Sequence, residues 1–222
     1  MLLNELETGI DSLLTLPRDG LYAVTPEHLH GAELLRGVEA VLRGGAVMLQ
    51  YRCKTQMLLR EDAFALQALC VRFNVPLVIN DHLELAATLA CGVHLGEQDV
   101  SVGEARARLG PRAIVGASCY DSVVLAQRAA DAGASYLAFG SFFPSVTKDQ
   151  PRRASEKHLR KAQFFGLPLV AIGGITVERG PALLSAGANY LAVVSALFDA
   201  ADPQLQAERF NGLWSQPGTK LH

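Results

Sequence analysis

Short apolar stretches alternate with longer segments of helical periodicity along most of the chain. The apolar stretches contain many β-branched residues and lack a polar face, which is typical of strands buried in a parallel sheet. We predict eight strands, at residues 21–24, 46–51, 77–80, 92–95, 113–118, 136–140, 169–172 and 191–194. The segments between them predict helices, among them 32–42, 60–73, 122–132, 156–165 and 181–186.

A repeated helix–glycine–strand junction supports this order of elements. Gly45, Gly133 and Gly187 each stand between a predicted helix and the next strand, where glycine commonly ends a helix. Eight strand–helix units in about 200 residues favour a single (β/α)₈ TIM barrel over an open doubly wound sheet. The sequence therefore predicts an α/β protein with a closed parallel barrel.

No linker or block of charge divides the chain, so we expect one domain over residues 1–222. The barrel is expected at 20–200, followed by a C-terminal tail at 201–222. Residues 1–19 are expected to form an N-terminal extension with an extra helix, because Leu3, Leu6, Ile10 and Leu13 share one apolar stripe. Such a helix could cap the floor of the barrel.

Composition narrows the possible partners. The 222 residues are 50% hydrophobic and 19% charged, which excludes a disordered chain. The formal charge of −2 argues against sequence-independent nucleic-acid binding. Four widely spaced cysteines suggest no disulfide framework or zinc knuckle, and neither a signal peptide nor a membrane span is evident. We expect a cytoplasmic protein that binds small molecules, and the sequence leaves a homodimer open.

In a TIM barrel, chemistry belongs at the carboxyl ends of the strands, where the loops converge. The second predicted strand ends in alternating polar residues, so Gln50, Arg52 and Lys54 are expected to point the same way. Two cations and an amide on one face can hold an anion and orient a polar ring. The alternative is an ordinary solvated strand end.

Carboxylates follow the next two strands. Asp81 comes directly after residues 77–80, and Asp99 follows the strand at 92–95, so adjacent strands should bring the two together. Oxygen ligands without softer donors favour Mg²⁺, which substrate phosphates commonly complete. Asp81 could instead cap the helix that begins near residue 83. His82 and His94 lack a third nitrogen or sulfur ligand at a recognisable spacing, so we interpret them as ordinary helix-start and strand-end histidines.

Later strand ends carry groups suited to phosphate. The loop after residues 136–140 contains hydroxyls and Lys148 beside backbone amides, and it is either a lid or a surface loop. Gly173 and Gly174 follow the seventh strand and Ser195 the eighth, where barrels often bind phosphate. Two phosphate sites in one mouth suggest a transfer reaction. No Ser-His-Asp or Cys-His arrangement indicates a covalent enzyme intermediate.

These motifs together resemble the thiamine-phosphate synthase family from about residue 21 to residue 198. The order and strand positions of the short motifs carry the resemblance: Gln50-Tyr51-Arg52-Cys53-Lys54, Asn80-Asp81, His94-Leu95-Gly96 with Asp99, Pro144-Ser145-Val146-Thr147-Lys148, Ile172-Gly173-Gly174-Ile175 and Val194-Ser195. The resemblance implies condensation of 4-amino-2-methyl-5-(diphosphooxymethyl)pyrimidine with 4-methyl-5-(2-phosphooxyethyl)thiazole or its carboxylated tautomer. The products would be thiamine phosphate and pyrophosphate, formed by a dissociative, Mg²⁺-assisted mechanism.

The resemblance also implies roles for individual residues. Asp81 and Asp99 would hold Mg²⁺. The catalytic residues would be Arg52, Lys54, Ser118 and Lys148. The pyrimidine diphosphate would contact Gln50, Arg52, Lys54, Asn80, Ser118 and Lys148, and the thiazole phosphate Ser145, Val146, Thr147, Gly174, Val194 and Ser195.

The chain departs from the family pattern at three positions. His82 stands where many members have a second aspartate, Cys53 replaces a commonly acidic residue, and Ser141 replaces a usual proline. Two alternatives share the scaffold. A thiazole tautomerase needs neither the pyrimidine diphosphate nor Mg²⁺, and a non-catalytic barrel would bind a phosphate ligand without releasing pyrophosphate.

Overall fold

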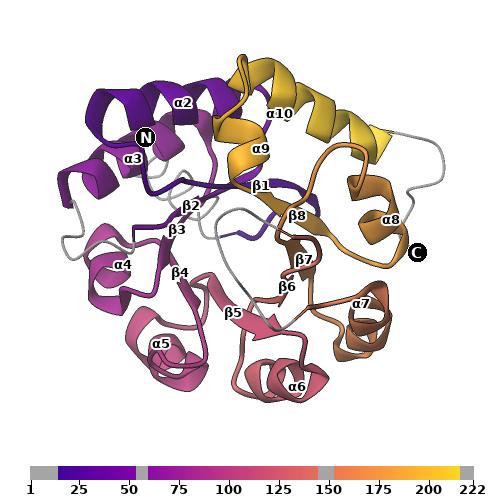
Figure 1. Cartoon of the computed structure of the whole chain (residues 1–222). Coiled ribbons are helices and arrows are strands. Elements are labelled where there is room, and N and C mark those ends of the chain that lie inside the picture. The colour runs from indigo at the N-terminus through magenta and orange to yellow at the C-terminus, as the bar shows by residue number, and fades with distance from the viewer. Residues whose placement is uncertain (1–14, 54–59, 145–152, 216–222) are drawn as a thin grey trace, which may run out of the picture.

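The computed structural model describes residues 15–53, 60–144 and 153–215. They form a closed barrel of eight parallel strands that neighbour one another in chain order, with the helices outside (Figure 1). The TIM-barrel prediction is therefore confirmed. The strands are β1 Gly20–Val24, β2 Met48–Tyr51, β3 Leu77–Asn80, β4 Gly92–Leu95, β5 Val115–Tyr120, β6 Tyr136–Gly140, β7 Leu169–Ile172 and β8 Tyr190–Val193.

The predicted helices also occur, with small shifts at their ends. The segment predicted as one helix at 156–165 is an α-helix that tightens into a 3₁₀ turn. The helices are α2 Gly31–Arg43, α3 Arg60–Phe73, α4 Leu83–Leu89, α5 Val102–Leu109, α6 Val123–Asp131, α7 Glu156–Ala162, α8 Gly180–Ser185, α9 Ser195–Phe198 and α10 Pro203–Asn211, with 3₁₀ turns η1 Gln163–Phe165 and η2 Gly212–Ser215.

The N-terminal prediction cannot be compared with the structure over residues 1–14, and the C-terminal segment differs from the prediction. Residues 1–14, which hold the expected N-terminal helix, lie outside the described residues, and 15–19 are not helical. The sequence predicts only a tail after residue 200, whereas the structure has α10, which lies beside α2 (Figure 1). Asn211 of α10 donates its side-chain amide to the carbonyl of Gly45 at 2.8 Å, so α10 is held against the loop before β2.

Alternating side chains of the strands build two apolar layers. Leu21 and Ala23 of β1 join the layer between the sheet and the helices. Tyr22 and Val24 point the other way and join a smaller cluster inside the barrel. That inner cluster includes Tyr136 of β6, so the barrel lumen is filled by side chains and carries phenol groups. The period of two along each strand explains the division.

No helix among residues 15–53, 60–144 and 153–215 has both the length and the apolar character needed to cross a bilayer.

Candidate active site at the carboxyl ends of the strands

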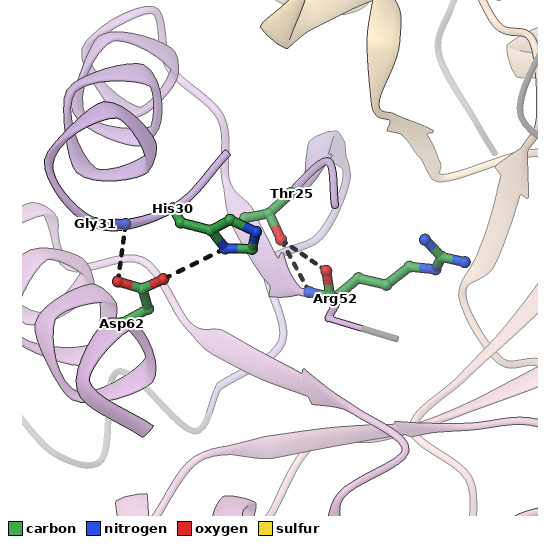
Figure 2. A network of polar contacts seen from close by, with 5 residues as sticks. All are labelled: Thr25, His30, Gly31, Arg52 and Asp62. Atoms are coloured by element: carbon green, nitrogen blue, oxygen red, sulfur yellow. Dashed lines mark hydrogen bonds and ion pairs between the residues drawn. The ribbon is translucent and has the colours of Figure 1, made fainter. Parts of the chain in front are cut away.

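The end of β2 presents one buried and one partly exposed polar side chain. Gln50 is 4% exposed and donates its side-chain amide to the phenol oxygen of Tyr22 at 2.9 Å, inside the barrel. Arg52 follows β2, and its backbone amide donates to the hydroxyl of Thr25 at 2.9 Å. Figure 2 shows this contact, with the Arg52 side chain extending away from the His30–Asp62 pair. The loop after β1 therefore anchors the backbone that carries the Arg52 cation.

Arg52 also has an acidic partner that the sequence did not suggest. Its Nη1 lies 2.7 Å from Oε1 of Glu27, and the two side chains are 19% and 40% exposed. The partners come from the loops after β1 and β2, 25 positions apart. The ion pair orients the guanidinium, and an anionic ligand at this end of the barrel must share or displace Glu27.

The two residues predicted to bind metal both contact β4 or the residue that follows it. The backbone amide of Asp81 donates to the carbonyl of His94 at 2.8 Å, and Oδ2 of Asp99 accepts from the amide of Gly96 at 2.7 Å. Asp81 has a left-handed backbone, with φ of 65°. The N-cap of α4 is His82, so Asp81 is not the residue that caps this helix.

A buried amide next to these carboxylates strengthens the case for a polar ligand. Asn80 ends β3 and is 6% exposed, and its Nδ2 atom has no hydrogen-bond partner within the described chain. A buried donor left without a partner costs about 1–3 kcal/mol, so such an atom commonly marks a ligand or an ion site. The Nδ2 group of Asn80 can only donate, so it suits an acceptor such as a phosphate oxygen, whereas the carboxylates of Asp81 and Asp99 are the ligand type that Mg²⁺ prefers.

No cluster of three or more His, Cys, Asp or Glu side chains occurs in the described segments. A cation held by Asp81 and Asp99 alone would need further oxygens from a ligand or water. Mg²⁺ typically binds in this way, through one or two carboxylates plus substrate phosphates.

Ser118 of β5 lies on a hydrogen-bond chain that leads into the lumen. Its hydroxyl is 2.9 Å from Nε2 of His94, and Nδ1 of His94 is 2.9 Å from the phenol oxygen of Tyr136. The His94 and Tyr136 rings are stacked, with centroids 5.6 Å apart and planes at 10°. His94, interpreted from the sequence as an ordinary strand-end histidine, thus contacts a predicted site residue directly.

The glycines after β7 permit a close approach of two loops. Gly174 has φ of 63°, and a Cβ added there would lie 2.7 Å from the carbonyl oxygen of Pro144, in the loop after β6. Arg179 stabilises the same junction, because its Nη1 donates to the Gly174 carbonyl at 2.7 Å and its guanidinium carbon lies 4.7 Å from the Phe143 ring centroid. Phe143 and Pro144, in the described part of the loop after β6, are therefore held against the loop after β7.

The other predicted phosphate contacts divide into two groups. Val194 follows β8 and is the N-cap of α9, which begins at Ser195, so both lie at the carboxyl end of the barrel. The remaining predicted site residues fall outside the described chain: Lys54, Ser145, Val146, Thr147 and Lys148.

Comparison with known proteins identifies the family. A sequence profile described as thiamine monophosphate synthase matches residues 21–197, which is the whole barrel. The chain belongs to the thiamine monophosphate synthase family. It is 49% identical over 204 residues to the thiamine-phosphate synthase of Methylobacillus flagellatus, covering 90% of this chain and 97% of that protein. It is 50% identical over 200 residues to the thiamine-phosphate synthase of Thiobacillus denitrificans, covering 88% and 95%.

A solved structure shows the same architecture. The thiamine phosphate pyrophosphorylase from Pyrococcus furiosus superposes with a TM-score of 0.79 and 29% identity, over 93% of this chain and 97% of that one. Both the sequence resemblance and the fold thus lead to the thiamine monophosphate synthase family.

A separate cavity lies at the opposite end of the barrel. It has a volume of about 820 Å³, and its lining includes Leu16, Pro111, Pro168 and Asn189, at the amino ends of the strands. None of the predicted site residues lines it. In TIM-barrel enzymes the amino end contributes to stability and the carboxyl end to catalysis, so we do not assign the chemistry of this thiamine monophosphate synthase family member to that cavity.

Proposed function

We propose that the chain condenses 4-amino-2-methyl-5-(diphosphooxymethyl)pyrimidine with the phosphorylated thiazole to give thiamine phosphate and pyrophosphate. When the thiazole is the carboxylated tautomer, its carboxyl group also leaves as CO₂. Near 50% identity over about nine-tenths of the chain to proteins named thiamine-phosphate synthase supports this activity. The structural observation that carries it is the succession of Gln50, Asn80 and Ser118 on β2, β3 and β5 of one closed barrel. In this proposal their side chains contact the pyrimidine diphosphate, and Asp81 binds the Mg²⁺ beside it.

The proposed reaction begins with loss of the diphosphate from the pyrimidine. The electron-rich aminopyrimidine forms a cation at its exocyclic carbon as the C–O bond to diphosphate breaks, and the thiazole nitrogen then captures this carbon. Asp81 and Asp99 would hold Mg²⁺, which would supply positive charge next to the leaving diphosphate. Arg52, Lys54 and Lys148 add to this charge, and positioning in a fixed polar environment provides most of the acceleration.

Hydrogen bonds orient the two substrates. Gln50 and Asn80 present amides to the pyrimidine diphosphate, and Ser118 offers its hydroxyl to the same ligand. The thiazole phosphate binds against Gly174, Val194 and Ser195, together with the residues at 145–147. The tight contact of Gly174 with Phe143 and Pro144 supports this second subsite. A cytoplasmic location and a homodimer belong to the proposal as well.

A pyrophosphate-release assay with both substrates, with and without Mg²⁺, tests the proposal. Pyrophosphate and thiamine phosphate should form together, and chelation of Mg²⁺ should abolish both. A thiazole tautomerase would release no pyrophosphate and need no Mg²⁺. A non-catalytic barrel would bind the thiazole phosphate in calorimetry and release nothing. Either result would refute the proposed condensation.

Substitutions localise the activity. Asp81→Asn and Arg52→Ala should each lower kcat by about a hundredfold or more, the typical cost of losing one transition-state charge contact. Arg36→Ala is the matched control, because Arg36 is an exposed arginine on α2, away from the strand ends. Near-native turnover of Arg52→Ala would contradict the assigned site.

A further inference from the structure

A chain of four hydrogen bonds crosses the inside of the barrel and joins two groups of the proposed site. It runs from the amide nitrogen of Gln50 to Tyr22, then to Tyr136, then through the ring of His94 to the hydroxyl of Ser118. Every donor–acceptor distance is 2.9 Å. The five residues come from five different strands: β2, β1, β6, β4 and β5.

In the first half of this hydrogen-bond chain, only one donor–acceptor direction gives every hydroxyl proton an acceptor. Within the described structure, the Tyr22 hydroxyl meets two polar groups, the amide nitrogen of Gln50 and the hydroxyl of Tyr136. An amide nitrogen only donates, so Tyr22 must donate its own proton to Tyr136. Burial raises the pKa of both phenols, so both keep their protons. The reverse direction would leave a buried hydroxyl unsatisfied, at a cost of about 1–3 kcal/mol.

The second half follows from the first. Because the Tyr136 oxygen accepts from Tyr22, its proton is available for Nδ1 of His94. A ring nitrogen that accepts carries no proton, so the imidazole proton sits on Nε2 and is donated to Ser118. The stacking on Tyr136 holds the His94 ring in the plane that reaches both partners. The hydroxyl of Ser118 therefore accepts from His94 and has its own proton left for a ligand.

We propose that His94 is a positioning residue of the reaction, which holds the Ser118 hydroxyl as a hydrogen-bond donor toward an oxygen of the diphosphate. The proposal rests on the proposed function, because it places the diphosphate next to Ser118. The orientation of the Gln50 amide sets the donor–acceptor direction of every hydrogen bond from Gln50 to Ser118. A ligand that accepts from Ser118 is favoured only while the Gln50 amide nitrogen points into the barrel.

The tautomer of His94 provides a test that does not depend on activity. In the protein labelled with ¹⁵N-histidine, the His94 signals are assigned by their absence from His94→Gln. Proton–nitrogen correlation spectra should show Nδ1 as the unprotonated nitrogen and Nε2 as the protonated one. A proton on Nδ1, alone or together with one on Nε2, would overturn the proposal. A protein without condensing activity but with the expected tautomer would instead refute the proposed function.

Two conservative variants separate positioning from packing. His94→Gln places an amide nitrogen near the position of Nε2 and keeps a donor for Ser118. His94→Asn is shorter and keeps only the partner for Tyr136. We expect His94→Asn to lower kcat by roughly tenfold to a hundredfold with KM changed less than about threefold, and His94→Gln to stay within about fivefold of native. Equal losses in both variants would count against the proposal.

A double-variant cycle completes the test. If His94 acts through Ser118, then His94→Asn in a Ser118→Ala background should lower kcat by less than about twofold. Losses that multiply would show that His94 acts independently of Ser118. Thermal unfolding of each variant checks that the fold is retained, and the tautomer measurement on the native chain stands whatever the variants do.

Discussion

Gly116 offers a sharp test of how the barrel interior is packed. It lies on β5 opposite Tyr136 of β6, and a Cβ added there would lie 2.0 Å from Cζ and 2.2 Å from the hydroxyl oxygen of that tyrosine. The Tyr136 ring cannot move aside freely, because it is fully buried, stacked on His94 and hydrogen-bonded to Tyr22. Gly116→Ala should therefore displace the ring and break the interior chain.

The expected cost combines overpacking with lost hydrogen bonds. Forcing an extra methyl group into a packed core costs about 1–3 kcal/mol. Each weakened hydrogen bond of Tyr136 adds about 1 kcal/mol. We expect Gly116→Ala to lower the free energy of unfolding by about 2–4 kcal/mol, a large part of the 5–15 kcal/mol typical of a domain. For a chain of this size, that lowers the melting temperature by about 4–16 °C.

Urea denaturation followed by circular dichroism measures this cost. The matched control is Gly103→Ala in α5, where the nearest atom to an added Cβ is 4.0 Å away, so the variant should gain up to about 1 kcal/mol from its helix propensity. In a Tyr136→Ala background, Gly116→Ala should cost less than about 0.5 kcal/mol, because the clash is gone. If Gly116→Ala unfolds at the native urea concentration, the packing argument is wrong.

Four further predictions concern other parts of the molecule. Ser101→Ala, which removes the capping box at the start of α5, should cost about 1 kcal/mol in urea denaturation. Hydrogen bonds from Ser101 lower the pKa of Glu104, so its stabilisation is present above the unfolded pKa and lost as pH falls; Glu104→Gln should reduce the acid dependence of the urea midpoint. Burial raises the pKa of the Cys91 and Cys119 thiols to about 12, so a thiol reagent at mildly alkaline pH should modify them only after unfolding. Glu27→Gln should lower KM for the pyrimidine diphosphate by up to about fivefold, since a partly exposed ion pair contributes at most about 1 kcal/mol, and an unchanged KM would mean that Glu27 does not compete with the ligand.

The alternation of strands and helices was readable from the sequence because burial on both faces leaves a clear apolar signature. The strands at Leu77–Asn80 and Gly92–Leu95 have the predicted bounds. The helix Pro203–Asn211 was not predicted. Its own residues are largely polar, and its position depends on contacts with Gly44 and Gly45, more than 150 positions earlier. Contacts of that kind leave no periodic trace in a short segment.

The candidate site shows a similar division. The rule that chemistry lies at the carboxyl ends of barrel strands was enough to select Gln50 and Asp81. Asn80 was assigned only through the family resemblance, and the roles of all three stay predictions. Glu27 and His94 were passed over, because each looks ordinary beside its neighbours in the sequence. Each contacts a predicted site residue about 25 positions away, and only the closed barrel brings the two within hydrogen-bond distance.

The polar interior of this barrel has a cost that apolar side chains would avoid. A buried network of phenols, an imidazole and an amide stabilises a fold only when every donor and acceptor is paired, because in a low dielectric a half-satisfied network is worse than an apolar core. Here the phenols of Tyr22 and Tyr136 are paired, and the proton without an acceptor in the network is the hydroxyl proton of Ser118 at its outer end. The requirement that the core be satisfied therefore determines which group the site presents to its ligand.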